Sequence, residues 1–318
     1  MKKIHILFAA AIALGLSACS NDDGQVESGG LTPINLKSRI AGDADTRAAL
    51  GIQHTSFDTG ENIFVQISIF DVAKNEIEQD YAPINFTSAA DGVLTPPANS
   101  YPYFPGDDRP IVVRALYPYN WASQSTDIEE TFEVQPNQTE RTYYKRSDLM
   151  FAQTPEPVYK TSITDQNPYV TLTFKHLLSK INVNLSSANQ TLIANARVKL
   201  LNVKRKVSVN KVTGELTAIE SVSLNPADEI QLASNSVSLT SSSAIIVPQT
   251  VPVGRFIEIK LSNNDIMTYK LFDPKEFEAG KSYTYNITVT ESGLSGISTV
   301  VTEWGSPIDI ATTMSATQ

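Results

Sequence analysis

Alternation of apolar and polar residues, with a period of two, runs through most of this chain and constrains its fold more than any other feature. Clear examples are Ile63, Val65, Ile67 and Ile69, and later Tyr283, Tyr285, Ile287 and Val289. A period of two places alternate side chains on opposite faces of a β-strand. No stretch of about twelve residues keeps the i, i+3, i+4, i+7 spacing of an amphipathic helix. The chain is therefore predicted to be all-β.

Turn signals between the strands predict β-sandwiches. Residues 210–215 (NKVTGE) and 262–265 (SNND) each separate two alternating runs, as in a hairpin. Proline is frequent between residues 83 and 168, where it suits strand ends and loops. Cleaner alternation starts at residue 170. We therefore expect two tandem domains, an N-terminal β-sandwich over 48–168 and a C-terminal one over 169–318.

The first residues have the pattern of a secretory signal peptide. Two lysines at positions 2 and 3 precede an apolar run over 4–16, and small residues then lead to Cys19. The run is shorter than the roughly 20 residues that span a bilayer. A buried N-terminal helix is the alternative, but the sequence turns polar and acidic directly after Cys19. Residues 16–19 (LSAC) also resemble the lipobox of bacterial lipoproteins, which implies a signal peptide over 1–18, cleavage between Ala18 and Cys19, and lipid on Cys19.

The segment over 19–47 combines a tether with one short strand. Cys19 is the only cysteine among 318 residues, so no disulfide is expected. Residues 20–30 are rich in Gly, Ser and Asp. Within 34–40 the apolar Ile34, Leu36 and Ile40 share one parity, which predicts a strand with one buried face.

Charge and composition exclude several classes of function. Asp and Glu number 34 against 25 Lys and Arg, a net charge of −9, so nucleic acid is not an expected partner. The acidity also disfavours anionic lipid surfaces, so only the lipid on Cys19 is expected to hold the chain to a membrane. No nucleophile elbow, phosphate loop or zinc helix motif is present. We therefore expect no catalysis, no cofactor and no metal site, and a structural role for His176.

The order of several motifs resembles the fimbrillin family, the subunits of type V pili. The motifs are residues 115–119 (ALYPY), 147–152 (SDLMFA), 172–181 (LTFKHLLSKI), 245–249 (IIVPQ), 277–289 (FEAGKSYTYNITV) and 303–305 (EWG). The resemblance implies two β-sandwiches of transthyretin-like topology. It also implies export as a lipoprotein to the outer membrane and cell surface, trimming by an arginine-specific surface protease, and polymerisation with other fimbrial subunits by donor-strand insertion, contributing to adhesion.

The resemblance assigns roles to particular residues. The strand over 34–40 is the removable one, and cleavage is expected between Arg47 and Ala48, in polar sequence just behind it. Arg39 is a rival site, although a cut there would fall inside the strand pattern. At the other end, Ile308 and Ile310 share a parity in a tail with no obvious partner strand, so residues 297–318 are a candidate donor segment. For 297–304, a last core strand is an equal alternative.

A rival interpretation from another class is a surface glycan-binding lipoprotein. It would keep the lipid anchor and use exposed aromatic side chains such as Tyr101, Tyr103 or Trp121. Packing of those side chains over the end of a sandwich is the simpler reading of the same residues.

Overall fold

The computed structural model describes residues 31–41, 56–218, 229–234 and 240–304. Within them the chain is built of strands, and its helices are short: α1 (Tyr119–Ala122), α2 (Arg141–Arg146), α3 (Gln190–Ile193), and the 3₁₀ turns η2 (Ala90–Gly92) and η3 (Lys160–Ser162). The prediction of an all-β chain is confirmed. No helix in the described ranges is long and apolar enough to cross a membrane.

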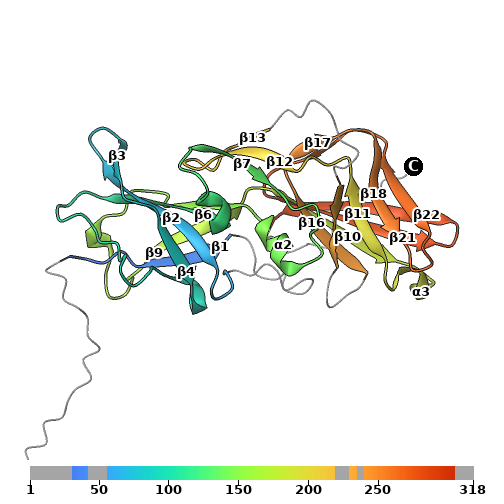
Figure 1. Ribbon diagram of the computed structural model, residues 1–318, viewed down its shortest axis with the longest axis horizontal. Coiled ribbons are helices and arrows are strands. Elements are labelled where there is room, and N and C mark those ends of the chain that lie inside the picture. The colour runs from blue at the N-terminus through green and yellow to red at the C-terminus, as the bar shows by residue number, and fades with distance from the viewer. Residues whose placement is uncertain (1–30, 42–55, 219–228, 235–239, 305–318) are drawn as a thin grey trace, which may run out of the picture. The chain divides into compact units, whose positions relative to one another are not determined.

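The N-terminal half forms one 8-stranded sheet (Figure 1). Its strands are β1 (Leu36–Ile40), β2 (Asn62–Asp71), β3 (Glu76–Asp80), β4 (Ile84–Ser88), β5 (Val93–Thr95), β6 (Ile111–Tyr117), β8 (Met150–Gln153) and β9 (Val170–His176). Strand β2 pairs with β4 along one edge and with β6 along the other. The order β2-β4-β5-β1-β9-β8-β6 therefore returns to β2, and the sheet closes into a ring.

The C-terminal half contains four further sheets. A 5-stranded sheet has the order β15 (Ala233–Ser234), β16 (Ser241–Ile246), β10 (Ser179–Ser186), β21 (Lys281–Thr290), β22 (Gly293–Glu303), and a 4-stranded sheet has β14 (Glu229–Gln231), β11 (Arg197–Leu201), β18 (Gly254–Lys260), β19 (Ile266–Leu271). Two smaller sheets are β13 (Leu216–Ala218), β12 (Lys206–Asn210), β7 (Glu129–Glu133), and β17 (Gln249–Val251), β20 (Lys275–Phe277).

Period-two burial explains how these sheets enclose a core. Along β10 the residues Ile181, Val183 and Leu185 are buried, while the asparagines between them are half-buried. They join one apolar cluster with buried residues of β11, β18 and β21, so the 5- and 4-stranded sheets pack face to face. Both predicted hairpins are present, with Val209 paired to Leu216 and Lys260 paired to Ile266.

The change from the first sheet to the second differs from the predicted boundary at residue 168. Strand β9 lies beyond that residue, yet it pairs with β1 and β8 of the ring. Strand β7 lies before it, yet it pairs with β12 of the C-terminal half. The sheet changes between β9 and β10, at Leu177 and Leu178. Local alternation identifies a strand but not its partner, so the sequence does not record where the sheet changes. The domain boundary at residue 168 stays a prediction.

Candidate functional site

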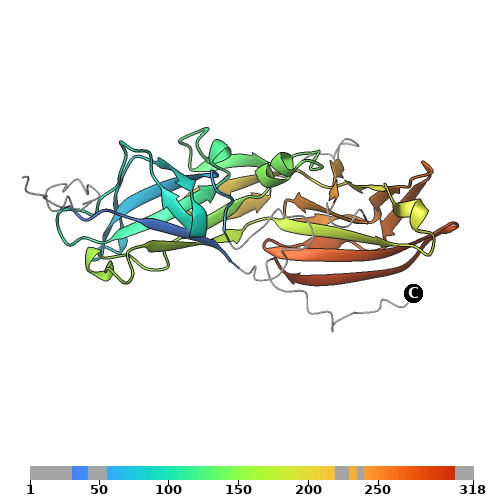
Figure 2. The same ribbon diagram turned by 90° about the horizontal axis from the view of Figure 1, so that it is seen from below.

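Strand β1 is a central member of the ring although it comes from the N-terminal end of the described chain (Figure 2, blue). It runs antiparallel to β5, with Leu36 opposite Leu94, and parallel to β9, with Leu36 opposite Val170 and Ile40 opposite Phe174. A strand was predicted over 34–40, and β1 confirms it. Its parallel pairing with β9 joins residues more than a hundred positions apart.

Backbone hydrogen bonds hold this segment on both sides. On the β9 side the N–H of Val170 donates to the carbonyl of Asn35 (2.8 Å) and that of Ala41 to Phe174 (2.8 Å). On the other side the N–H of Ile34 donates to the carbonyl of Pro102 (2.9 Å), and that of Phe104 donates to Thr32 (2.9 Å). Without residues 32–41, the ring would therefore have two unpaired edges facing one slot.

The inward face of β1 fills the apolar core of the ring. Ile34, Leu36 and Ile40 are buried and belong to the same cluster as residues of β2, β6 and β9. Burying an apolar side chain of this size contributes about 1.5–3 kcal/mol. These three side chains therefore anchor residues 34–40 in the apolar core.

The fourth inward position is small and polar. Ser38 is buried, and its hydroxyl donates to the carbonyl of Gly92 (3.0 Å). Gly92 has a φ of +77°, and a Cβ there would lie 2.2 Å from the carbonyl oxygen of Ser38. The chain at η2 thus approaches β1 too closely for any side chain at position 92. The sequence analysis missed both residues, although a glycine after Asp91 is a turn signal.

The outward face of β1 carries the rival cleavage residue. Arg39 is exposed, but its backbone lies in the β1–β9 ladder opposite Thr173, and its Nε donates to Thr173 Oγ1 (2.8 Å). The other site residues predicted from the sequence lie outside the described residues: Ala18, Cys19, Arg47, Ala48, Ile308 and Ile310.

Residues 297–303 belong to β22, which pairs with β21 inside the chain's own sheet, Lys281 opposite Glu303 and Thr284 opposite Val300. Trp304 follows and is buried, its ring stacked on His176 with centroids 4.1 Å apart. His176 Nδ1 in turn lies 2.8 Å from Asp148 Oδ1. His176 thus packs where the first sheet ends, and no group of His, Cys, Asp and Glu in the described residues has a metal-binding arrangement.

The aromatic residues of the glycan-binding alternative differ in their exposure. Trp121 is buried, donates its indole N–H to the carbonyl of Thr131 (2.9 Å) and meets Phe132 edge-on. Tyr101 is exposed and Tyr103 is half-buried beside Pro33. Trp121 is therefore a core residue rather than a sugar platform.

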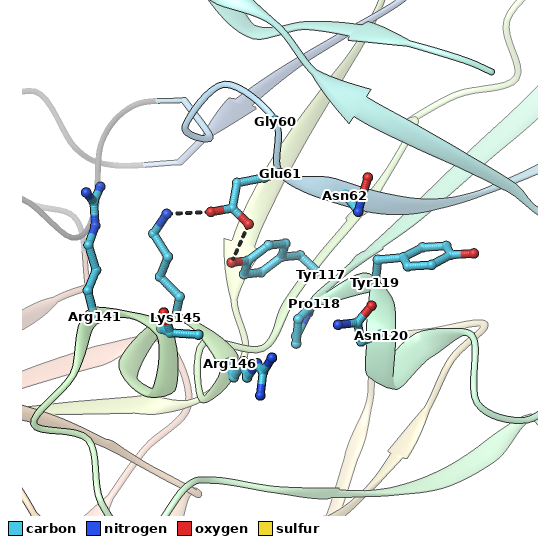
Figure 3. A pocket seen from close by; sticks show the side chains of 11 residues that line it. Gly60, Glu61, Asn62, Tyr117, Pro118, Tyr119, Asn120, Arg141, Lys145 and Arg146 are labelled. Carbon is cyan, nitrogen blue, oxygen red and sulfur yellow. Dashed lines mark hydrogen bonds and ion pairs between the residues drawn. The ribbon is translucent and has the colours of Figure 1, made fainter. Parts of the chain in front are cut away.

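A cavity of about 310 Å³ lies between the start of β2, the end of β6 and helix α2 (Figure 3). Lys145 of α2 points toward Glu61, to which the hydroxyl of Tyr117 also donates (3.2 Å). Burial raises the pKa of Tyr117, and the negative charge of Glu61 raises it further. Lys145 and Arg141 also pair with Asp58. These ion pairs fasten α2 to the residues that precede β2, and Arg146 of α2 adds a further positive charge to the lining of the cavity.

Comparison with known proteins gives consistent matches along the chain. The family model described as fimbrillin-like matches residues 46–304. A protein named "Putative fimbrium subunit Fim1C" from Bacteroides uniformis is 23% identical over 315 residues, covering 96% of each chain.

Solved structures share the fold. A "putative cell adhesion protein" from Bacteroides ovatus has a TM-score of 0.66 and 19% identity, covering 86% of this chain and 98% of its own. One with the same description from Bacteroides uniformis has a TM-score of 0.63 and 20% identity, covering 87% of this chain and 99% of its own.

Proposed function

The chain belongs to the fimbrillin-like family, and from this we propose that it is a structural subunit of a surface fimbrium that contributes to adhesion and polymerises by exchanging β1 for a strand of another subunit. The proposal assigns the chain no catalysis and no cofactor. Its partners are other fimbrial subunits and an arginine-specific surface protease.

One observation carries this proposal: the N-terminal strand β1 is an interior strand of the ring, with a neighbouring strand on each side. An ordinary terminal strand sits at a sheet edge, where its loss exposes one neighbour. Loss of β1 exposes the backbone of two neighbours. One is β9, and the other is formed by β5 together with residues 102–104. It also uncovers the apolar core beneath them. An open slot with an apolar floor and two unpaired edges is the receptor for β-strand addition. Polymerisation supplies the missing strand.

The steps before polymerisation form the finer part of the proposal. The signal peptide over 1–18 directs export, and lipid on Cys19 anchors the precursor in the outer membrane at the cell surface. Cleavage between Arg47 and Ala48 then frees residues 19–47, β1 included. Arg39 is the less suitable site, since proteases bind their substrates as an extended strand and the backbone of Arg39 is already paired with β9.

The cleavage step is tested by a pair of charge-preserving substitutions, Arg47→Lys and Arg39→Lys. An arginine-specific protease discriminates against lysine, and lysine keeps the positive charge at both positions. We expect Arg47→Lys to retain its N-terminal segment and form no fibres, while Arg39→Lys is trimmed and assembles like the unaltered protein. Trimming is read from the N-terminal sequence of surface protein and assembly by electron microscopy. Wild-type fibre yield from Arg47→Lys would overturn the assigned cleavage site.

The exchange step is tested at the other end of the chain. Ile308→Asp would place a charge in an apolar slot, so we expect it to block assembly of protease-trimmed protein. Asp309→Asn, next to it, removes a charge from the opposite face of the same strand and serves as the control. Normal fibres from Ile308→Asp would show that the donated strand is not the one at 308–310.

A further inference from the structure

The cavity beside α2 carries one positive charge more than its ion pairs neutralise. Lys145 pairs with both Asp58 and Glu61, and Arg141 pairs with Asp58. Arg146 lines the same cavity, and its guanidinium has neither an ion pair nor a hydrogen bond within the part of the chain that the structure describes. Three cationic side chains thus face two carboxylates. In a chain with a net charge of −9, this local excess favours an anionic ligand.

Groups that bind hydroxyls lie in the same cavity. Asn62 of β2 and Asn120 of α1 line it, and both are exposed, as Arg146 is, so a ligand can reach them from solvent. We propose that the cavity binds a sugar residue that carries a carboxylate, a uronic acid at the end of a glycan, with the carboxylate on Arg146 and the hydroxyls on the two asparagines. The site belongs to the folded subunit, so this inference goes beyond the proposed function and does not depend on strand exchange.

The backbone that presents Arg146 is held firmly. Ser147 follows it and is buried, and its hydroxyl donates to the carbonyl of Tyr143 (2.9 Å) and accepts from the N–H of Gln135 (3.0 Å). Tyr144, one turn back in α2, is fully buried. A fixed backbone lowers the entropic cost of binding, because only the side chain of Arg146 has to become ordered around the ligand.

The charges in the cavity give a bound ligand one orientation. Figure 3 shows Glu61 and Asn62 on the side of β2, and Arg146 and Asn120 on the side of α1 and α2. The carboxylate of Glu61 repels a second carboxylate but accepts hydrogen bonds from hydroxyls. Asn62 already accepts with its Oδ1 from the hydroxyl of Thr87 (3.3 Å), so its amide N–H groups are left to donate. The anionic end of the ligand therefore lies toward Arg146 and its hydroxyl end toward β2.

Size and overall charge favour a single acidic sugar over a polyanion. The volume of about 310 Å³ lies at the lower end of the roughly 300–1,000 Å³ typical of small-molecule sites. A long polyanion would extend over the rest of a chain whose net charge is −9 and would be repelled there. A guanidinium binds a planar carboxylate through two parallel N–H···O bonds, which suits the one carboxylate of a uronic acid.

Calorimetric titration of the full-length protein tests the ligand class. The probes are methyl β-D-glucuronide and methyl β-D-galacturonide, with the matching neutral methyl glucoside and galactoside, and the N-acetyl amide of glutamic acid as a carboxylate without a sugar. We expect one uronide to bind at least about tenfold more tightly than the neutral sugars and the amino acid. A neutral sugar that bound equally well would overturn the role of the carboxylate. Equal binding of the glutamic acid derivative would overturn the assignment to a sugar, and no binding of either uronide would overturn the site.

Substitutions test the residues. We expect Arg146→Gln to lower the affinity for the uronide at least about tenfold, because a charge-assisted pair is lost, and Asn120→Ala to lower it less. The control is Arg197→Gln, which removes the same charge from an exposed position on β11 and should leave the affinity unchanged. Melting temperatures of all three variants should match that of the unaltered protein. Equal affinities of Arg146→Gln and Arg197→Gln, or an unchanged affinity of Asn120→Ala, would overturn the corresponding contact. Assembly into fibres is measured separately, so failure of the sugar site leaves the proposed strand exchange intact.

Discussion

Truncation of Leu36 to alanine measures how firmly β1 closes the ring. Leu36 has an exposed fraction of 0% and contacts the apolar core between β5 and β9. Leucine-to-alanine changes at such sites cost about 2–5 kcal/mol, the transfer term plus the cavity left behind. The strand is paired on both sides, so the backbone cannot move inward to fill the space. We therefore expect a loss in the middle of that range for full-length Leu36→Ala.

The assay is urea unfolding of the full-length protein followed by circular dichroism, with Lys37→Ala as control. Lys37 is the next residue but points to the opposite face and is partly exposed, so its truncation should change stability by about 0.5 kcal/mol or less. After protease trimming both variants lose the altered residue and must behave identically. A change below about 1 kcal/mol for full-length Leu36→Ala would refute the idea that β1 seals an apolar core.

Three further outcomes are expected. Cys19→Ala should abolish palmitate labelling and leave the precursor unprocessed, and labelling that persisted would contradict lipid on this thiol. Deletion of 306–318 should abolish fibres while leaving the melting temperature of the monomer unchanged; a large fall would make the tail core sequence. Burial raises the pKa of Tyr117, Tyr144 and Tyr285, so their contribution to stability is full below the unfolded-state pKa of about 10 and is lost as the pH rises further. Absorbance at 295 nm with parallel unfolding curves checks this, and a single titration near pH 10 without loss of stability would contradict it.

Local pattern was sufficient to predict the strands and their buried faces. In β1 and β10 the predicted parity matches the observed burial, because one face of each strand meets a core and the other meets solvent or a neighbouring layer. The hairpin at 210–215 could be predicted equally well, since its turn residues lie between two strands that pair with each other. These features depend on residues close together in sequence.

Which strands pair with one another could not be predicted from the sequence in the same way. The parallel pair β1–β9 and the closure of β2 onto β6 join distant segments, and no side-chain period records which distant strand lies alongside. Ser38 illustrates a second limit. In the sequence it is a polar residue that interrupts an apolar face. Only the structure, in which the backbone of Gly92 lies close to the backbone of Ser38, shows that a small residue is required there.

The position of the proposed cleavage relative to β1 would explain how a strongly held strand becomes exchangeable. While the chain is continuous, β1 is tethered to its slot, and a short tether holds it at an effective concentration in the millimolar range or above. Cleavage behind β1 leaves every contact of the strand in place but removes the tether. The freed segment then competes with the tails of neighbouring subunits through its own contacts alone. In the proposed assembly, a donor strand that fills the same slot and remains part of a folded subunit would win that competition. The covalent cut, rather than any weakness in the packing of β1, would then control when polymerisation starts.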